Sequence, residues 1–200
     1  MNIQQLRHHL AATGIFLMAG GGLLRADNLI ANGSFENEVP FDSVTAMRQY
    51  QNAFSEKNFE FDFDQSRWAD GWVINGDMDA AKVSFGERED GGRFLRIDSR
   101  GKSHLYTAET LPMGQYKASF MAKGGDNGAV PQVTPLLYYY DNAGWIALKR
   151  LQSFPLSDQW ESFAYDIPAD AAPENAARLR IAYEFSGLCD FDDVVVEDAP

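Results

Sequence analysis

Aromatic side chains that could stack on a flat ligand gather between residues 138 and 145. The chain of 200 residues contains 14 Phe, 8 Tyr and 4 Trp, and such rings either fill a core or pack against a ligand. Tyr138, Tyr139 and Tyr140 are consecutive, so in a strand the middle ring takes the opposite face from the other two. One set must be core, and the sequence leaves open which. Trp145 follows the turn residue Gly144, and we expect it to be exposed.

Charged side chains near these rings could supply hydrogen bonds to the same ligand. Apolar residues alternate with polar ones from Leu179 to Phe185, which predicts a strand with one buried and one outer face. Arg180 and Glu184 fall on the outer face. Trp72 and Trp160 stand inside strand-like stretches, and we expect both to be core residues.

No catalytic set can be assembled from the residue types and their spacing. The chain has three His, of which His8 and His9 lie in an N-terminal leader-like segment, so only His104 remains. No Ser/His/Asp set stands out, and no pair of carboxylates has a spacing that implies a catalytic separation. The carboxylates are numerous enough for acid–base work, so an enzyme remains the less favoured alternative.

The elements that must position these residues are strands. Short apolar runs alternate with polar residues and are separated by turn residues, which is typical of an all-β protein. Asp141 to Gly144 predicts a hairpin turn, and Ser43 to Ser55 is the one helix that we expect. We therefore predict two packed antiparallel sheets with one short helix in an insertion. The runs centre on Phe59–Phe63, Leu95–Ile97, Tyr116–Phe120 and Leu179–Phe185.

The N-terminus has the plan of a secretory signal. Arg7 precedes an uncharged apolar stretch from Leu10 to Leu24, and polar sequence begins at Asp27. The stretch is shorter than the roughly 20 residues of a membrane span. We predict a cleaved signal at 1–26, with cleavage nearer Ala19 and an uncleaved anchor as alternatives. The mature domain, 27–200, would then be secreted or lie in the periplasm or cell envelope, without a membrane span.

The charge and cysteine content exclude several partners. The formal net charge is −12, and removal of the two Arg in 1–26 leaves −14. Such an acidic surface repels phosphate backbones, so nucleic acid and anionic membranes are poor partners, whereas calcium suits carboxylate ligands. The single Cys189 excludes an intrachain disulfide, and we expect it to be a buried apolar residue.

Three stretches together resemble a known family. Asn28-Leu29-Ile30-Ala31-Asn32-Gly33-Ser34-Phe35-Glu36, Gly71-Trp72 and Phe191-Asp192-Asp193-Val194-Val195-Val196 are similar to the opening, a following Gly-Trp and the terminal strand of jelly-roll carbohydrate-binding modules. These are the calcium-bearing, galactose-binding-like modules found with cellulases and xylanases. The resemblance implies a two-sheet jelly-roll β-sandwich over about 28–197, with the first and last motifs on adjacent strands.

The resemblance also implies non-catalytic binding of a poly- or oligosaccharide outside the cytoplasm, beside a separate glycan-active enzyme. Pyranose rings stack on Trp and Tyr, and their hydroxyls need polar partners. His104 aligns with a cleft position that is often aromatic in the family. The acidic charge favours neutral glycans. The expected contacts are Trp145, Tyr138, Tyr140, His104, Arg180 and Glu184.

A structural calcium ion is the cofactor that the family implies. Its ligands, carried over residue by residue, would be the side chains of Glu36, Asp90 and Asp192 with the carbonyls of Ser34 and Arg93. Oxygen ligands from separate segments suit calcium. Asp193 is the alternative to Asp192, because a shift of one residue reverses which carboxylate faces inward.

Two alternatives to sugar binding remain open. The chain could be a structural or adhesive envelope protein that binds another protein, or, less favoured, a glycan-active lyase or hydrolase. The stretch 37–70 is longer than the family often has, and it leaves open whether the usual cleft is accessible.

Overall fold

The computed structural model describes residues 28–40, 67–76 and 81–199, and this part of the chain is almost entirely strand. The signal segment 1–26, the expected helix 43–55 and the expected strand around Phe59–Phe63 lie outside these ranges. The described residues contain one 3₁₀ turn, η2 (Ala169–Ala171), and no helix long and apolar enough to cross a membrane. The strands are β1 (Glu38–Pro40), β2 (Arg67–Ala69), β3 (Trp72–Gly76), β4 (Ala81–Glu87), β5 (Arg93–Thr107), β6 (Leu111–Pro112), β7 (Tyr116–Gly125), β8 (Gln132–Tyr140), β9 (Trp145–Arg150), β10 (Phe154–Pro155), β11 (Glu161–Ile167) and β12 (Arg178–Asp198).

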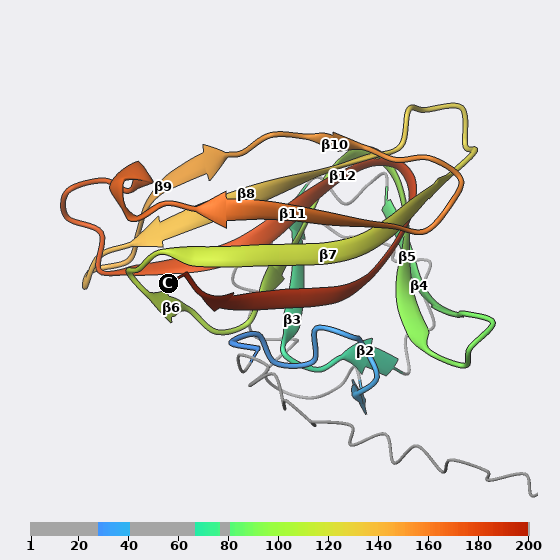
Figure 1. The fold of residues 1–200 in the computed structure, drawn as a ribbon, viewed down its shortest axis with the longest axis horizontal. Helices are drawn as coiled ribbons and strands as arrows, with labels where there is room; N and C mark the ends of the chain where they lie inside the picture. The colour runs from blue at the N-terminus through green and yellow to red at the C-terminus, as the bar shows by residue number, and fades with distance from the viewer. Residues whose placement is uncertain (1–27, 41–66, 77–80, 200) are drawn as a thin grey trace, which may run out of the picture.

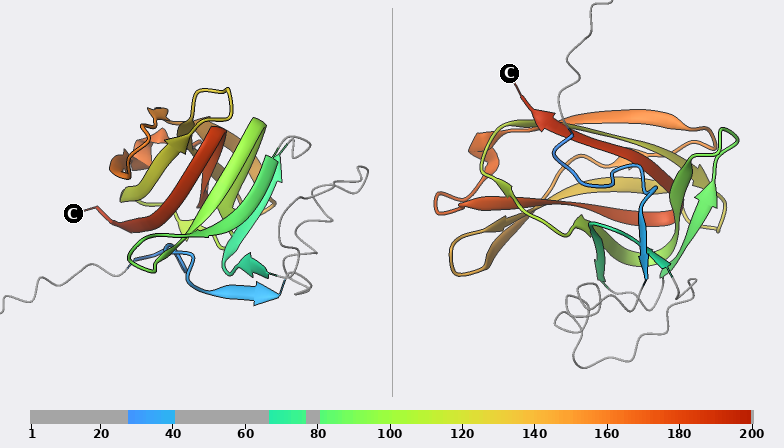
Figure 2. Two further views of the ribbon diagram at one scale, coloured as in Figure 1. Left: turned by 90° about the vertical axis from the view of Figure 1, so that its right-hand side faces the viewer. Right: turned by 90° about the horizontal axis from the view of Figure 1, so that it is seen from below.

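Two antiparallel layers share two long strands. One layer has the order β9-β8-β12-β5-β3 and the other the order β11-β7-β12-β5-β4. The first half of β12 pairs with β8, and its second half pairs with β7. Figures 1 and 2 show β12 passing from one layer to the other at one end of the sandwich. The predicted all-β jelly-roll sandwich is confirmed.

Strand β12 changes layers at a glycine. Its pairing with β5 shifts register between Phe185 and Gly187, and Gly187 has a φ of 74°. Glycine adopts this left-handed conformation at little steric cost. A Cβ at Gly187 would also lie 2.8 Å from the Cα of Pro131, so the bend leaves no room for a side chain.

The core lies between the layers and is rich in aromatic rings. Alternate residues of β12, including Tyr183 and Phe191, are fully buried against Phe120 from β7. Trp72 is 2% exposed, as expected for a core residue. Cys189 is also buried, as expected, and burial raises the pKa of its thiol to about 12.

The N-terminal motif packs along the last strand, as the resemblance implies, but residues 28–37 form turns rather than a strand. The Asn28 side chain donates to the Val194 carbonyl at 2.8 Å and accepts from the Val196 N–H at 2.9 Å. The Val194 N–H donates to the Gly33 carbonyl at 2.8 Å. These contacts join segments that are more than 160 residues apart in the sequence.

We predict that Gly33→Ala destabilises the domain. A Cβ at Gly33 would overlap the carbonyl oxygen of Val194, so the motif would have to move away from β12. Overpacking of this kind costs about 1–3 kcal/mol. Chemical denaturation would measure the loss, with Ser34→Ala as the neighbouring control, expected to stay within about 0.5 kcal/mol. Equal stability of the two variants would contradict the assigned packing.

Candidate functional site

One sheet face collects every residue expected to contact a ligand. Directly opposite residues of paired strands point to the same face, and the register places Tyr138 opposite Arg180, His104 opposite Glu184 and Trp145 opposite Tyr140. Tyr139 is 1% exposed and lies in the core, so Tyr138 and Tyr140 take the outer face. We call this surface the aromatic face; its members are His104, Tyr106, Tyr138, Tyr140, Trp145, Arg180 and Glu184.

Tyr106 was missed by the sequence analysis. It is opposite Ala182 on β12 and packs against Tyr138, with ring centroids 6.1 Å apart. Its position two residues after His104 in an alternating strand is the signal that would have found it.

A chain of hydrogen bonds fixes the middle of the aromatic face. Burial is the main cause that raises the pKa of Tyr138 to about 12, so its hydroxyl stays protonated and donates to Nδ1 of His104 at 2.6 Å. With Nδ1 as the acceptor, the N–H of the neutral ring is at Nε2, which donates to Oε2 of Glu184 at 2.9 Å. Arg150 also donates to Oε2 of Glu184, at 2.8 Å. Burial would raise the pKa of Glu184, but the bonds from Arg150 and His104 outweigh it and lower the pKa.

Arg180 lies between two rings on the same face. Its guanidinium carbon is 5.1 Å from the ring centroid of Tyr106 and 5.3 Å from that of Tyr140, which are cation–π distances. Nη2 donates to the Ala108 carbonyl at 2.8 Å, and Nη1 makes a long 3.4 Å bond to the Tyr140 hydroxyl. The side chain is therefore held in place by groups that carry no charge.

The polar groups stand on an apolar floor. Val73, Leu136 and Ala182 are buried beneath them, and Leu148 packs against the same cluster. Trp145 stands at the margin of the face, opposite Tyr140, and is 59% exposed. Ligand-binding surfaces typically combine aromatic rings, buried apolar residues and a few fixed hydrogen-bond donors, and the aromatic face has all three.

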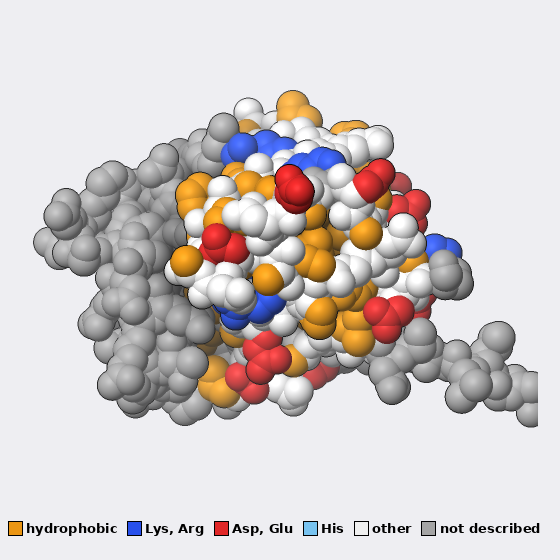
Figure 3. Space-filling model, turned by 90° about the vertical axis from the view of Figure 1, so that its left-hand side faces the viewer, with side chains coloured by type: hydrophobic (Ala, Val, Ile, Leu, Met, Phe, Trp, Pro, Cys, Tyr) orange, Lys and Arg blue, Asp and Glu red, His pale blue; other side chains and the backbone are white. Residues whose placement is uncertain are grey.

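Charges of both signs are interspersed near this part of the sandwich. Figure 3 views the end of the molecule that is at the left of Figure 1, and basic side chains there lie among acidic and apolar ones. No field of one sign dominates the described surface in this view.

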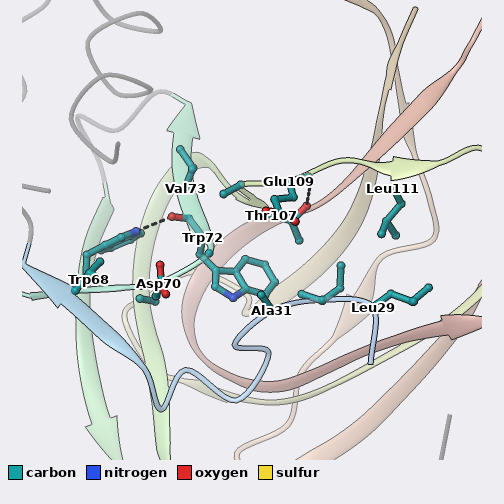
Figure 4. Close-up of a pocket in the computed structure, with 14 residues that line it drawn as sticks. Leu29, Ala31, Trp68, Asp70, Trp72, Val73, Thr107, Glu109 and Leu111 are labelled. Atoms are coloured by element: carbon teal, nitrogen blue, oxygen red, sulfur yellow. Dashed lines mark hydrogen bonds between the residues drawn. The ribbon is translucent and has the colours of Figure 1, made fainter. Parts of the chain in front are cut away.

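A pocket of about 320 Å³ adjoins the aromatic face at Val73 and Ala108. Figure 4 shows the ring of Trp72 in its wall, with Leu29 and Leu111 on one side. The Trp72 indole N–H donates to the Asn32 carbonyl at 3.0 Å, which ties the wall to the N-terminal motif. The sequence analysis used Trp72 only as a mark of the fold and did not predict this pocket.

Trp160 is not a core residue, in contrast to the sequence prediction. It lies half-buried on the outside of the second layer, edge-on to Phe94 at 5.3 Å and under Lys123 at 5.4 Å. It comes just before β11, so alternation does not determine its face.

Two of the expected calcium ligands come together. Asp192 is 1% exposed, and burial is the main cause that raises its pKa to about 7, with Glu36 among the like charges that add to this. Oδ2 of Asp192 accepts no hydrogen bond, although Nη1 of Arg88 lies 2.9 Å away. Glu36 accepts from the Arg93 N–H at 2.8 Å. A buried carboxylate oxygen without a hydrogen bond suits a hard cation.

The remaining carboxylates are held by Arg88. Asp90 is exposed, accepts from the Gly92 N–H at 3.0 Å and lies 3.3 Å from Nε of Arg88. Asp193 contacts Nη1 of Arg88 at 3.0 Å. In the described residues no three His, Cys, Asp or Glu side chains gather at one metal position. Arg88 contacts all three aspartates, but only Asp192 is buried, so we propose Glu36 and Asp192, with the Ser34 and Arg93 carbonyls, as the calcium ligands, with the exposed Asp90 left on Arg88.

Comparison with known proteins identifies the fold. No model of a protein family matches the chain, and no curated protein matches it in sequence. Among solved structures, the CBM22-1–GH10 modules of the Clostridium thermocellum xylanase 10B match with a TM-score of 0.51 and 17% identity, over 66% of this chain and 26% of that one. A structure described as CBM4 matches with a TM-score of 0.48 and 20% identity, over 85% and 99%.

The enzymatically active domain of tailspike protein 4 from bacteriophage CBA120 matches with a TM-score of 0.48 and 14% identity, over 64% of this chain. This chain spans 19% of that tailspike chain and 26% of the xylanase chain. The chain thus has the jelly-roll fold of carbohydrate-binding modules, as its motifs imply. Several other matched structures are xylan-binding domains, at 14–17% identity and TM-scores of 0.46–0.48.

We predict that calcium stabilises the domain through Asp192. A ligand that binds only the folded state adds about 2.7 kcal/mol at a hundredfold excess over its Kd, or several degrees in Tm. Thermal melts with CaCl₂ and with EGTA would measure this for the wild type, Asp192→Asn and Asp90→Asn. The shift should vanish in Asp192→Asn and persist in Asp90→Asn. A wild-type Tm that is the same in both buffers would exclude the metal.

We predict that Glu184 stabilises the fold only while it is ionised. Its pKa is lowered in the folded state, so its contribution is present above the unfolded pKa of about 4.3 and is lost as pH falls through the folded value. The free energy of unfolding should therefore differ between the wild type and Glu184→Gln at pH 5–8, and the difference should shrink below about pH 4. Glu174→Gln, an exposed residue away from the face, serves as control. If the difference in the free energy of unfolding between the wild type and Glu184→Gln grew as the pH fell, the hydrogen bonds assigned to Glu184 would be contradicted.

Proposed function

We propose that the aromatic face binds a polysaccharide or oligosaccharide without chemical change. The observation that carries this proposal is that Tyr138, Tyr140, Trp145, Arg180 and Glu184, with His104, come from four different strands and meet on one face. The rings offer stacking surfaces for the C–H faces of sugars, and the charged groups offer bonds to hydroxyls.

The arrangement is prepared before a ligand arrives. His104, Tyr138, Glu184 and Arg150 hold one another by hydrogen bonds of 2.6–2.9 Å. Side chains that are already ordered lose little rotamer entropy on binding, so more of the contact energy appears as affinity. Trp145 is the exposed ring, and a sugar that stacks on it would bury apolar surface that is now in water.

Xylan oligosaccharides are the first ligands to test. The matched xylanase modules were solved with xylohexaose, and the shared fold supports that choice of probe. The net charge of −12 favours a backbone that is mostly neutral, because like charges repel across a wet interface. β-Glucan and mannan oligosaccharides extend the series.

The proposal includes a location and a cellular role. The basic, apolar and small residues of 1–26 support export, so the mature domain would act outside the cytoplasm. A binding domain without its own chemistry would act beside a separate glycan-active enzyme.

We predict that Trp145→Ala weakens glycan binding and leaves stability nearly unchanged. Loss of a stacked ring costs about 1–3 kcal/mol, or roughly five- to a hundredfold in Kd. Titration calorimetry with xylo-, gluco- and manno-oligosaccharides would measure the change. Val130→Ala is the matched control, because Val130 is 73% exposed and is not part of the aromatic face.

If no glycan gives a binding signal in the calorimeter, the proposed function is contradicted. The alternative of an envelope protein that binds another protein is then favoured. A large fall in Tm for Trp145→Ala would show instead that its ring supports the fold.

A further inference from the structure

Arg180 lacks the carboxylate partner that four of the described arginines have. Arg88, Arg93, Arg96 and Arg150 each contact at least one carboxylate. The described part of the chain places no carboxylate within ion-pair distance of Arg180; its contacts are two tyrosine rings, the Tyr140 hydroxyl and the Ala108 carbonyl. Arg178 also lacks a carboxylate, but it is exposed and water can solvate its charge.

Part of the Arg180 guanidinium is cut off from water. Nε of Arg180 is buried and has no hydrogen-bond partner. A charged group that is partly desolvated and unpaired is costly. Carboxylates are not scarce in this chain, which has 29 acidic and 17 basic side chains. Arg180 therefore lacks a carboxylate partner because the fold places none beside it, and not because the chain has too few acidic residues.

We infer that Arg180 receives the carboxylate of a uronic acid unit in a glycan that is otherwise neutral. This inference rests on the proposed function and narrows its ligand. The guanidinium fork matches a carboxylate with two parallel hydrogen bonds, which neutral hydroxyls cannot equal in strength. The two donors would be Nη1, whose 3.4 Å bond to the Tyr140 hydroxyl is long, and the second N–H of Nη2, whose first N–H is on the Ala108 carbonyl.

The flanking rings explain how an acidic sugar would be held. Tyr106 and Tyr140 lie on either side of the guanidinium, and Tyr140 is adjacent to the exposed Trp145. A uronate ring could stack on an aromatic side chain while its carboxylate points to Arg180. Neutral neighbouring units would extend toward Tyr138 and His104 along the same face.

The charges around Arg180 limit the number of acidic units. Arg150 is already bound to Glu184, which stands four residues from Arg180 on β12, roughly 13 Å along the strand. The net charge of −12 also repels a polyanion. A single uronate carboxylate would pair with Arg180. The further carboxylates of a polyuronate would find no such partner and would be repelled by the net negative charge of the protein.

The test compares ligands that differ only in the carboxylate. Calorimetry would use xylo-oligosaccharides with one glucuronic acid branch, the same compounds with the branch as methyl ester, and linear xylo-oligosaccharides. A galacturonate-capped oligosaccharide and its ester form a second pair. We expect the acid of at least one pair to bind at least tenfold more tightly than its ester, which corresponds to 1.4 kcal/mol.

Variants separate the carboxylate contact from general binding. Arg180→Met should remove the preference for acid over ester, and Arg180→Lys should keep only part of it, because lysine lacks the fork. Arg178→Met is the control on the same strand and should keep the full preference. If Arg180→Met does not fold, the comparison of each acid with its methyl ester on the wild-type protein still tests the inference.

Equal affinity for acid and ester in both pairs, with neutral glycans bound, would overturn this inference and leave the proposed function intact. If no glycan of any kind binds, the proposed function and this inference both fail.

Discussion

The passage of β12 through both layers is the constraint on which the rest of the structure depends. Its first half holds Arg180 and Glu184 on the aromatic face, and its second half holds Asp192 beside Glu36. The bend between them needs a glycine, because Gly187 has a φ of 74° and a Cβ at this position would clash with the backbone of Pro131. A change at this bend would therefore move the aromatic face and the proposed calcium ligands together.

Alternation of apolar and polar residues was enough to predict the strands β5, β7 and β12, but not every face. Tyr139 is core while Tyr138 and Tyr140 are not, and only packing decides this when all three positions are aromatic. Trp160 was assigned wrongly because it precedes β11, where no alternation applies. The bond between His104 and Tyr138 joins residues 34 positions apart, so it follows from strand pairing and not from local pattern.

Net charge and local charge give different information about the ligand. The total of −12 describes the whole surface and predicts repulsion of polyanions at long range. At contact distance the outcome depends on which charges are already paired. Glu184 is satisfied by Arg150 and His104, whereas Arg180 is satisfied only by rings and neutral oxygens. A sequence count cannot make this distinction, because it depends on which residues become neighbours in the fold.

The hydrogen bonds of the aromatic face favour recognition over proton transfer. A general base needs a free acceptor near its substrate. Both nitrogens of His104 are engaged, one by Tyr138 and one by Glu184. The pKa of Tyr138 is about 12, so its hydroxyl is a donor and not a base at neutral pH. The pKa of Glu184 is lowered, which keeps it ionised and bound to Arg150 rather than able to give up a proton. These groups hold one another in fixed positions, and the proposed sugar binding would use this fixed set of donors and acceptors to select one ligand over another.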